Sequence, residues 1–176
     1  MKKSSLFLFV FVFTFSVVQA QNMQTAIKTE ALNMAKNLAA LDLEGYASFS
    51  WPALANDPKS KQMIKQGVDS AEKFRKQFGI KVKSIIIGNP SVVVTHKGVM
   101  QCTIPQNLTV EAMMGSIATE TTLIGLSTDG VKWYFVDALL FKSNSKTKLP
   151  ELSPKLIIPA AKAPVILGAD GKEFKQ

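Results

Sequence analysis

Residues 80–95, IKVKSIIIGNPSVVVT, decide the fold, because the hydrophobic periodicity changes there from helical spacing to alternation. Residues 80–87 are rich in β-branched side chains and end at Gly88-Asn89-Pro90, which predicts a strand followed by a turn. Residues 91–95 predict a second strand, and His96-Lys97-Gly98 turns the chain into a third. Consecutive strands joined by such short turns predict an antiparallel sheet.

The strand pattern continues beyond this segment. Residues 100–110 alternate apolar and polar side chains, and Pro105, which has no N–H to donate, predicts a bulge or a sheet edge within that third strand. Residues 116–127 predict a long fourth strand. Asp129-Gly130 is typical of a tight hairpin, which would lead into a fifth strand over residues 131–141.

The segment before these strands has helical spacing. Asn22 predicts the cap of a first helix, and Asp42 the cap of a short second helix that ends near Trp51-Pro52. Asp57-Pro58 predicts the start of a third helix and Gly79 its end. The third helix is expected to bury its apolar residues: Met63, Ile64, Val68, Ala71, Phe74 and Phe78. Helices followed by a meander of strands predict the α+β class, with N-terminal helices packed on a curved antiparallel sheet.

The first twenty residues have the pattern of an export signal. Two lysines precede the apolar run Leu6–Val18, and Val18-Gln19-Ala20 offers small side chains where a signal peptidase cuts. The run is shorter than the roughly 20 residues that cross a bilayer as a helix, which disfavours the alternative of a retained anchor. We therefore expect residues 1–20 to be a cleaved signal peptide. The mature chain would begin at Gln21, in the periplasm or outside the cell, without a membrane anchor.

The composition changes again after Phe141. Residues 142–176 carry seven lysines against three acidic side chains, together with four of the eight prolines. This composition predicts an extended basic arm attached to a domain formed by residues 21–141. Four apolar residues of the arm are expected to dock: Leu152, Leu156, Ile157 and Ile158. The last dozen residues are expected to fray.

The composition excludes several kinds of site. With 176 residues, 47% of them hydrophobic, the chain has the size of one domain with a core. A single cysteine and a single histidine exclude a disulfide framework and multi-ligand Cys or His metal sites, so neither a metal nor a cofactor is expected. Cys102 lies on the apolar face of its strand without a base beside it in sequence, which favours buried packing over nucleophilic catalysis.

The formal net charge of +8 raises the question of polyanionic partners. Only one of the 21 basic residues is an arginine, and the basic residues form no stripe interleaved with aromatic side chains. We therefore expect no nucleic-acid partner. Anionic envelope material is the more available partner for an exported chain, and a solvated surface is the simpler interpretation.

Three features together resemble the secreted bacterial branch of the nuclear transport factor two-like superfamily, which has a cystatin-like, cone-shaped fold. They are the opening helix running through Leu41–Tyr46 to Trp51-Pro52, the long helix before a curved sheet, and the closing segment Asp129–Asp137. The resemblance covers about residues 23–141 and consists of residue types rather than catalytic signatures. It implies a pocket between the helices and the concave sheet, which serves dehydratases, isomerases and cyclases in some members and binding or assembly in others. It also implies a homodimer through the open sheet face as a candidate assembly.

Asp137 and His96 are the candidate catalytic residues, because enzymes of the resembled fold place an Asp or a His on the concave face as general acid or base. By alternation, Asp137 shares a face with Trp133 and Phe135, where desolvation would raise its pKa. The alternative is a wet rim position or a pair with a lysine. His96 lies in a turn, which is typical of an exposed loop histidine. A dyad would require the hairpin tip to meet the end of the last strand.

The candidate ligand-binding residues are mostly aromatic, because an aromatic side chain with a polar tip suits a pocket mouth and methionine adapts to apolar ligands. They are Tyr46, Trp51, Met113, Trp133, Phe135 and Asp137, with core packing as the alternative for each. Three functions stay open. The leading one is an exported binding module with a concave, mostly apolar pocket for a small ligand. The others are a dehydratase-like or isomerase-like acid/base enzyme and an envelope interaction module that uses the sheet face or the basic arm.

Overall fold

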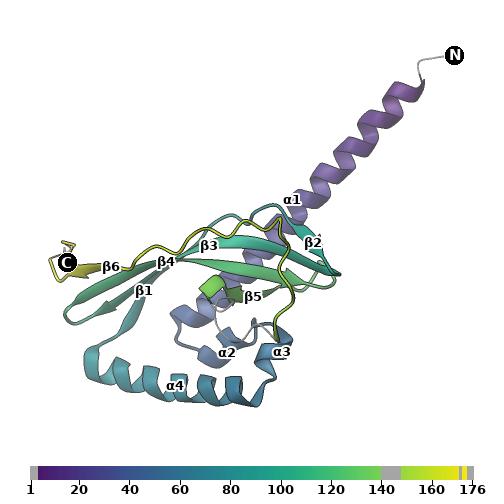
Figure 1. The fold of residues 1–176 in the computed structure, drawn as a ribbon. Helices are drawn as coiled ribbons and strands as arrows, with labels where there is room; N and C mark the ends of the chain where they lie inside the picture. The colour runs from purple at the N-terminus through teal and green to yellow at the C-terminus, as the bar shows by residue number, and fades with distance from the viewer. Residues whose placement is uncertain (1–3, 140–147, 171, 174–176) are drawn as a thin grey trace.

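The structure, a computed structural model, describes residues 4–139, 148–170 and 172–173 (Figure 1). This part of the chain is α+β, as the sequence predicts, with four helices and a six-stranded antiparallel sheet. The helices are α1 (Ser4–Ala39), α2 (Leu43–Ala47), α3 (Pro52–Ala55) and α4 (Pro58–Phe78). The strands are β1 (Lys81–Ile87), β2 (Val94–His96), β3 (Val99–Ala112), β4 (Gly115–Ser127), β5 (Tyr134–Asp137) and β6 (Val165–Gly168).

Two long strands, β3 and β4, form the centre of the sheet and pair in one continuous register. The other side of β3 is shared by β1 and β2, and the other side of β4 by β5 and β6. Pro105 lies in β3 between the segments that pair with β1 and β2, where its carbonyl accepts the N–H of Gly88 at 2.8 Å. Pro105 thus lies in the gap between β1 and β2, a local sheet edge as predicted, while its pairing with β4 continues without a bulge.

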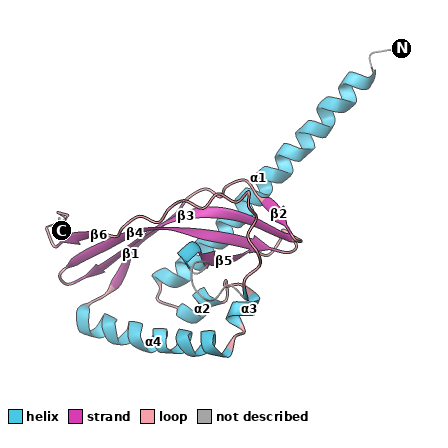
Figure 2. Ribbon diagram, viewed as in Figure 1, coloured by secondary structure: helices cyan, strands magenta, loops and turns pink. Residues whose placement is uncertain are grey.

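One face of the sheet, which we call the helix-side face, is covered by the second half of α1 (Figure 2). Ile27, Ala31 and Met34 are buried there at the 3- and 4-residue spacing that the sequence shows. They pack with Ile104 of β3 and with Trp133 just before β5. This cluster is the main core of the molecule.

α1 begins at Ser4 rather than at the predicted cap Asn22, because the sequence has no Gly or Pro within the helix to stop it. The helix runs through the expected cleavage point before Gln21, and Figure 1 shows its first half projecting beyond the sheet. Of the side chains that the structure describes, the first buried one is Ile27. Among the described residues, no helix is long and apolar enough to cross a membrane.

The opposite face of the sheet, which we call the arm-side face, is covered by the C-terminal arm. Leu149 is buried there with Ile124, Leu126 and Val136. As predicted, three further apolar residues of the arm pack against this cluster: Leu152, Leu156 and Ile158. Ile157 is 83% exposed, because neighbouring residues of an extended segment face opposite ways.

The end of the arm forms β6, which pairs with β4 from Gly115↔Gly168 to Ala118↔Val165. The predicted fraying of the last dozen residues is therefore wrong for this strand. β5 pairs with β4 only from Leu123 to Leu126, which leaves the N-terminal part of that edge open for another strand.

β5 is also shorter than the predicted fifth strand. The carboxylate of Asp129 accepts the N–H groups of Val131 and Lys132 at 2.8 and 2.9 Å, so these residues belong to an Asx-type loop. Gly130 in this loop has a φ of +73°. The prediction of a tight two-residue hairpin is thus wrong. Residues 140–141 of the predicted strand lie outside the described part of the chain.

The predicted caps of the later helices are confirmed. Asp42 accepts the N–H of Gly45 at the start of α2, at 2.8 Å, and Asp57 caps α4. Gly79 ends α4 with a φ of +62°. The predicted second helix, α2, ends at Ala47, earlier than the predicted end near Trp51-Pro52. Trp51 is extended, as expected before a proline, and the short helix α3 that begins at Pro52 was not predicted.

α4 departs furthest from prediction, because none of its residues is buried. Met63, Phe74 and Phe78, which were expected in the core, are 70%, 48% and 44% exposed. The helix-side face of the sheet already carries α1, so α4 packs on α2 and α3 instead (Figure 1). The apolar face of α4 is therefore open to solvent over much of its length.

Candidate functional site

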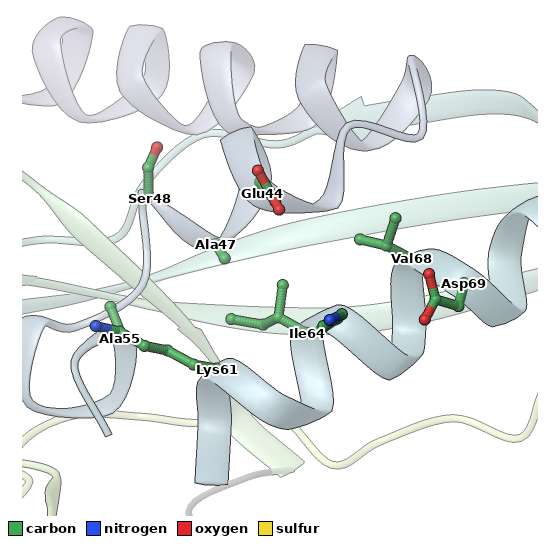
Figure 3. Close-up of a pocket in the computed structure, with 9 residues that line it drawn as sticks. Glu44, Ala47, Ser48, Ala55, Lys61, Ile64, Val68 and Asp69 are labelled. Carbon is green, nitrogen blue, oxygen red and sulfur yellow. The ribbon is translucent and has the colours of Figure 1, made fainter. Parts of the chain in front are cut away.

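An open groove lies between α4 and the two short helices α2 and α3 (Figure 3). Its volume is about 710 Å³, within the range of small-molecule sites. Figure 3 shows Ile64 and Val68 projecting from α4 on the side of α2. The apolar floor comes from all three helices: Ala47, Ala55, Ile64 and Val68.

Polar side chains also line the groove: Glu44, Ser48, Lys61, Lys65 and Asp69. Two carboxylates and two ammonium groups give this lining no formal net charge. The groove can therefore enclose an apolar body and bind a polar end group of either sign by hydrogen bonds or ion pairs.

The groove exists because local signals separate α4 from the helices before it. Asp57 caps α4, with the Ser60 N–H at 3.1 Å, and Pro58 occupies its first position. Lys148 of the arm forms an ion pair with Asp57. The hydrogen bond from Lys148, together with the Ser60 N–H, holds the pKa of the Asp57 carboxyl below its ordinary value. The charged form of the cap is thereby favoured.

Trp133 and Phe135, two of the predicted ligand-binding residues, lie in the main core at 1% and 3% exposure. The indole N–H of Trp133 donates to the carbonyl of Gly130 at 3.3 Å. Both side chains serve packing in this structure, which is the alternative that the sequence left open.

Tyr46 and Asp137 lie on the same side of the sheet. Burial raises the pKa of the Tyr46 hydroxyl, and the negative charge of Asp137 raises it further. Asp137 itself accepts the N–H of Leu139 at 2.8 Å. A cavity beside Asp137 has a volume of about 20 Å³, room for about one water molecule. This cavity, formed by described residues, has room for water and not for a substrate.

Trp51 and Met113 are far less buried than the core aromatics. Trp51 packs edge-to-face on Tyr134, with ring centroids 5.7 Å apart. Met113 is 71% exposed near the turn between β3 and β4, beside Gly79. The six predicted ligand-binding residues are therefore spread over the core, the β5 edge and a hairpin tip rather than joined in one pocket.

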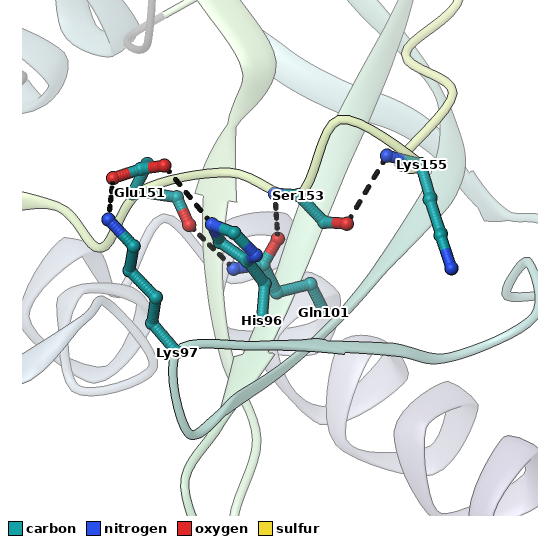
Figure 4. Close-up of polar contacts among 6 residues, drawn as sticks. All are labelled: His96, Lys97, Gln101, Glu151, Ser153 and Lys155. Carbon is teal, nitrogen blue, oxygen red and sulfur yellow. Dashed lines mark hydrogen bonds and ion pairs between the residues drawn. The ribbon is translucent and has the colours of Figure 1, made fainter.

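His96 belongs to a polar cluster that fastens the arm (Figure 4). Its Nε2 lies 3.1 Å from a carboxylate oxygen of Glu151, whose other oxygen pairs with Lys97. Beneath them, Gln101 donates to the Glu151 carbonyl and accepts the N–H of Ser153, both at 2.8 Å. Gln101 is fully buried by these contacts. The amide nitrogen and the amide oxygen of Gln101 thus both have a hydrogen-bond partner, as buried polar groups in proteins normally do.

The structure does not bring His96 and Asp137 together. His96 pairs with Val99 at one end of β3, whereas Asp137 pairs with Leu123, which lies opposite Ile104. The two residues are thus separated by several residues along β3, on the order of 15 Å, and lie on different strands. A His–Asp dyad would need a different sheet.

Cys102 is fully buried, as the sequence predicts. Burial raises the pKa of its thiol to about 12. A protonated thiol is a poor nucleophile and a poor metal ligand. Within residues 4–139, 148–170 and 172–173, no three His, Cys, Asp or Glu side chains are grouped closely enough to hold a metal ion.

The groove itself is not among the sites that the sequence predicts. Ile64 and Val68 follow helical spacing, which predicts burial against a sheet rather than the wall of an open groove. One sequence signal could have predicted the groove. Pro52 and Pro58 both start helices and are close together in sequence, so α3 is too short to cover α4.

Comparisons of the chain with family models, with curated proteins and with solved structures found no match. The groove and the contacts around it are therefore the observations from which a function can be argued.

Proposed function

We propose that the chain is an exported binding protein that holds a small, mostly apolar ligand in the groove between α2, α3 and α4. The observation that supports this most directly is a groove of about 710 Å³ with an apolar floor and a charged rim. The sequence favoured the concave sheet face for this role. Side chains of α1 occupy that face around Trp133 and Phe135, so the groove is the better candidate.

The lining suggests the chemistry of the ligand. Ile64 and Val68 offer branched aliphatic surface to an apolar body, and burying such surface contributes about 25 cal/mol per Å². Lys61 and Lys65 or Glu44 could pair with one polar end group. An amphipathic molecule with a short apolar body fits both parts of the groove.

The proposal is tested by binding a fluorescent probe to the unchanged chain and to a variant whose groove is filled by a larger side chain. The neutral fluorophore N-phenyl-1-naphthylamine should bind with a blue-shifted, enhanced emission that titrates to saturation. Ala55→Phe places a ring on the groove floor and should weaken binding at least about tenfold. Ala53→Phe is the matched control, because Ala53 lies on the same short helix but is exposed outside the groove.

Thermal unfolding of both variants, followed by circular dichroism, verifies that they fold. If folded Ala55→Phe binds the fluorophore as tightly as Ala53→Phe, the groove is not the ligand site. Competition by unlabelled fatty acids of increasing chain length then measures the length of apolar body that the groove accepts.

Export is part of the same proposal. The supporting observations are the signal-like pattern of residues 1–20 and the start of the described buried core at Ile27, beyond the expected cleavage point. Expression of the full chain in a bacterial host with N-terminal sequencing of the product should find Gln21 first. Retention of the uncleaved chain in the cytoplasm would contradict export.

We propose kinship with the nuclear transport factor two-like superfamily on the same footing. One supporting feature is the long helix α1, which lies across one face of an antiparallel sheet. The other is the pair of short helices, α2 and α3, that precede the strands in the chain. An experimental structure of the chain tests the cone shape directly, because a flat sheet without a concave face would contradict it.

A further inference from the structure

An exposed apolar stripe runs along α4 outside the groove. Met63, Phe74 and Phe78 are 70%, 48% and 44% exposed. At 3.6 residues per turn, these three positions fall within about 60° of one another around the helix axis. The groove residues Ile64 and Val68 lie on the neighbouring sector, so the stripe and the groove are different surfaces of one helix.

The stripe continues onto the hairpin between β3 and β4. The N–H of Met113 donates to the carbonyl of Phe78 at 3.2 Å, which places the hairpin tip against the end of α4. Met113 and Met114 are 71% and 88% exposed. Phe74 and Phe78 contact each other, with ring centroids 5.9 Å apart. We call the five residues Met63, Phe74, Phe78, Met113 and Met114 the apolar ridge.

Basic side chains flank the part of the apolar ridge that lies on α4. This helix carries six basic residues, of which Lys61 and Lys65 line the groove instead. Lys59 lies one turn before Met63, and Lys73 directly precedes Phe74. Lys76 is paired with Glu72 at 2.7 Å, so this pair contributes no net charge beside the ridge.

We propose that the apolar ridge docks on the surface of an anionic lipid bilayer. A helix with aromatic and aliphatic residues on one side and lysines around them lies in the headgroup region of a membrane, with its apolar side among the first acyl carbons. Each lysine or arginine near such a surface contributes about 1 kcal/mol by attraction to anionic lipids. The positive flanks of α4 are the complement that selects an anionic surface over a neutral one. The ridge is adapted to peripheral docking and leaves the groove free.

Vesicle binding tests the proposal. The chain should co-sediment with phosphatidylcholine vesicles containing about 30% phosphatidylglycerol, and far less with phosphatidylcholine alone. About 0.5 M salt should weaken the binding, because screening reduces the attraction of the lysines. The triple variant Phe74→Ser, Phe78→Ser, Met114→Ser should bind at least about tenfold more weakly.

A matched control keeps the test specific. Val92→Ser with Val131→Ser removes two valines that are 76% and 78% exposed elsewhere on the surface, and should bind as the unchanged chain does. All proteins carry the same N-terminus, so any binding through residues 1–20 is common to them. The groove variant Ala55→Phe should also keep its vesicle binding, which separates this proposal from the ligand site.

Two results would overturn the proposal. One is equal binding of the triple variant and the valine control. The other is a concentration-dependent dimer in sedimentation velocity that the triple variant abolishes, without vesicle binding by the unchanged chain, because a second copy would then be the occupant of the ridge.

Discussion

At the residue scale, Cys102 shows how completely the sheet and α1 exclude water. Its side chain is 0% exposed, and its Sγ would lie only 2.8 Å from a Cβ added at Gly125 on the neighbouring strand. Burial is the dominant cause that raises the pKa of the thiol from its ordinary 9.0 to about 12. Cys102 is therefore a buried core residue whose thiol stays protonated.

Thiol labelling measures this burial. At pH 8 the folded thiol should be ionised in about one molecule in 10⁴, so Ellman's reagent should react with folded Cys102 slowly and with the urea-unfolded chain at once. The unfolded thiol loses its proton near 9.0, below the folded value of about 12. The free energy of unfolding should consequently fall as the pH rises above 9. Rapid stoichiometric labelling of the folded chain would show that this part of the core is open.

At the element scale, β6 is the strand that local sequence does not reveal. Gly115, at the start of β4, has a φ of +145°, and a Cβ there would lie 2.2 Å from the carbonyl oxygen of Leu167. The close approach of β6 thus depends on a glycine at this position.

Two glycine substitutions separate backbone strain from this contact. Gly98→Ala, at a φ of +79° with nothing within 4 Å of the added Cβ, should cost about 1 kcal/mol. Gly115→Ala adds the collision with β6 and should lower the free energy of unfolding by more than about 2 kcal/mol. Urea unfolding of both variants measures the difference. Equal losses would mean that β6 does not pair closely with Gly115 in solution.

The elements that the sequence predicts are those whose signals are local. Asp42, Asp57 and Gly79 act on backbone groups within four residues, so the helix ends could be predicted from their residue types alone. β6 could not, because its pairing depends on where β5 stops on the shared strand β4. The length of β5 depends in turn on the side-chain hydrogen bonds of Asp129.

The candidate site could be predicted only in part. Apolar spacing identified Ile64 and Val68 as one face of a helix, but it predicted burial. Which helix occupies the sheet is a competition between α1 and α4, and that competition depends on the whole fold. Ile27, Ala31 and Met34 are buried against the sheet, so α1 is the helix that occupies this face.

At the scale of the whole molecule, the sheet separates two cores, one under α1 and one under the C-terminal arm. The arm is fastened at both ends of its path. Glu151 pairs with His96 and Lys97 near one end, and Lys162 pairs with Glu120 before β6 begins. The basic arm is thus part of the domain's packing.

The contact of Glu151 with His96 and Lys97 should depend on pH. Hydrogen bonds from Lys97, and then from His96, hold the pKa of Glu151 below its ordinary value. The contact is therefore present at neutral pH and is lost as the pH falls through that lowered pKa. Glu151→Gln should loosen the arm already at pH 7.5, so trypsin should cut after Lys155 several-fold faster. Glu72→Gln is the control, because that carboxylate pairs only within α4.

Amide exchange of residues 149–158, corrected for intrinsic rates, should rise in the unchanged chain as the pH is lowered toward 3 and vary less in Glu151→Gln. Equal cleavage of Glu151→Gln and Glu72→Gln would show that the apolar contacts of the arm suffice without the ion pairs.

Because the arm and β6 follow β4 and β5 in the chain, the nascent polypeptide cannot close its second core until the arm has been synthesised. Ile124, Leu126 and Val136 stay uncovered on the growing polypeptide until Leu149 and the residues after it have been added. During that interval these apolar side chains are a surface that chaperones can bind.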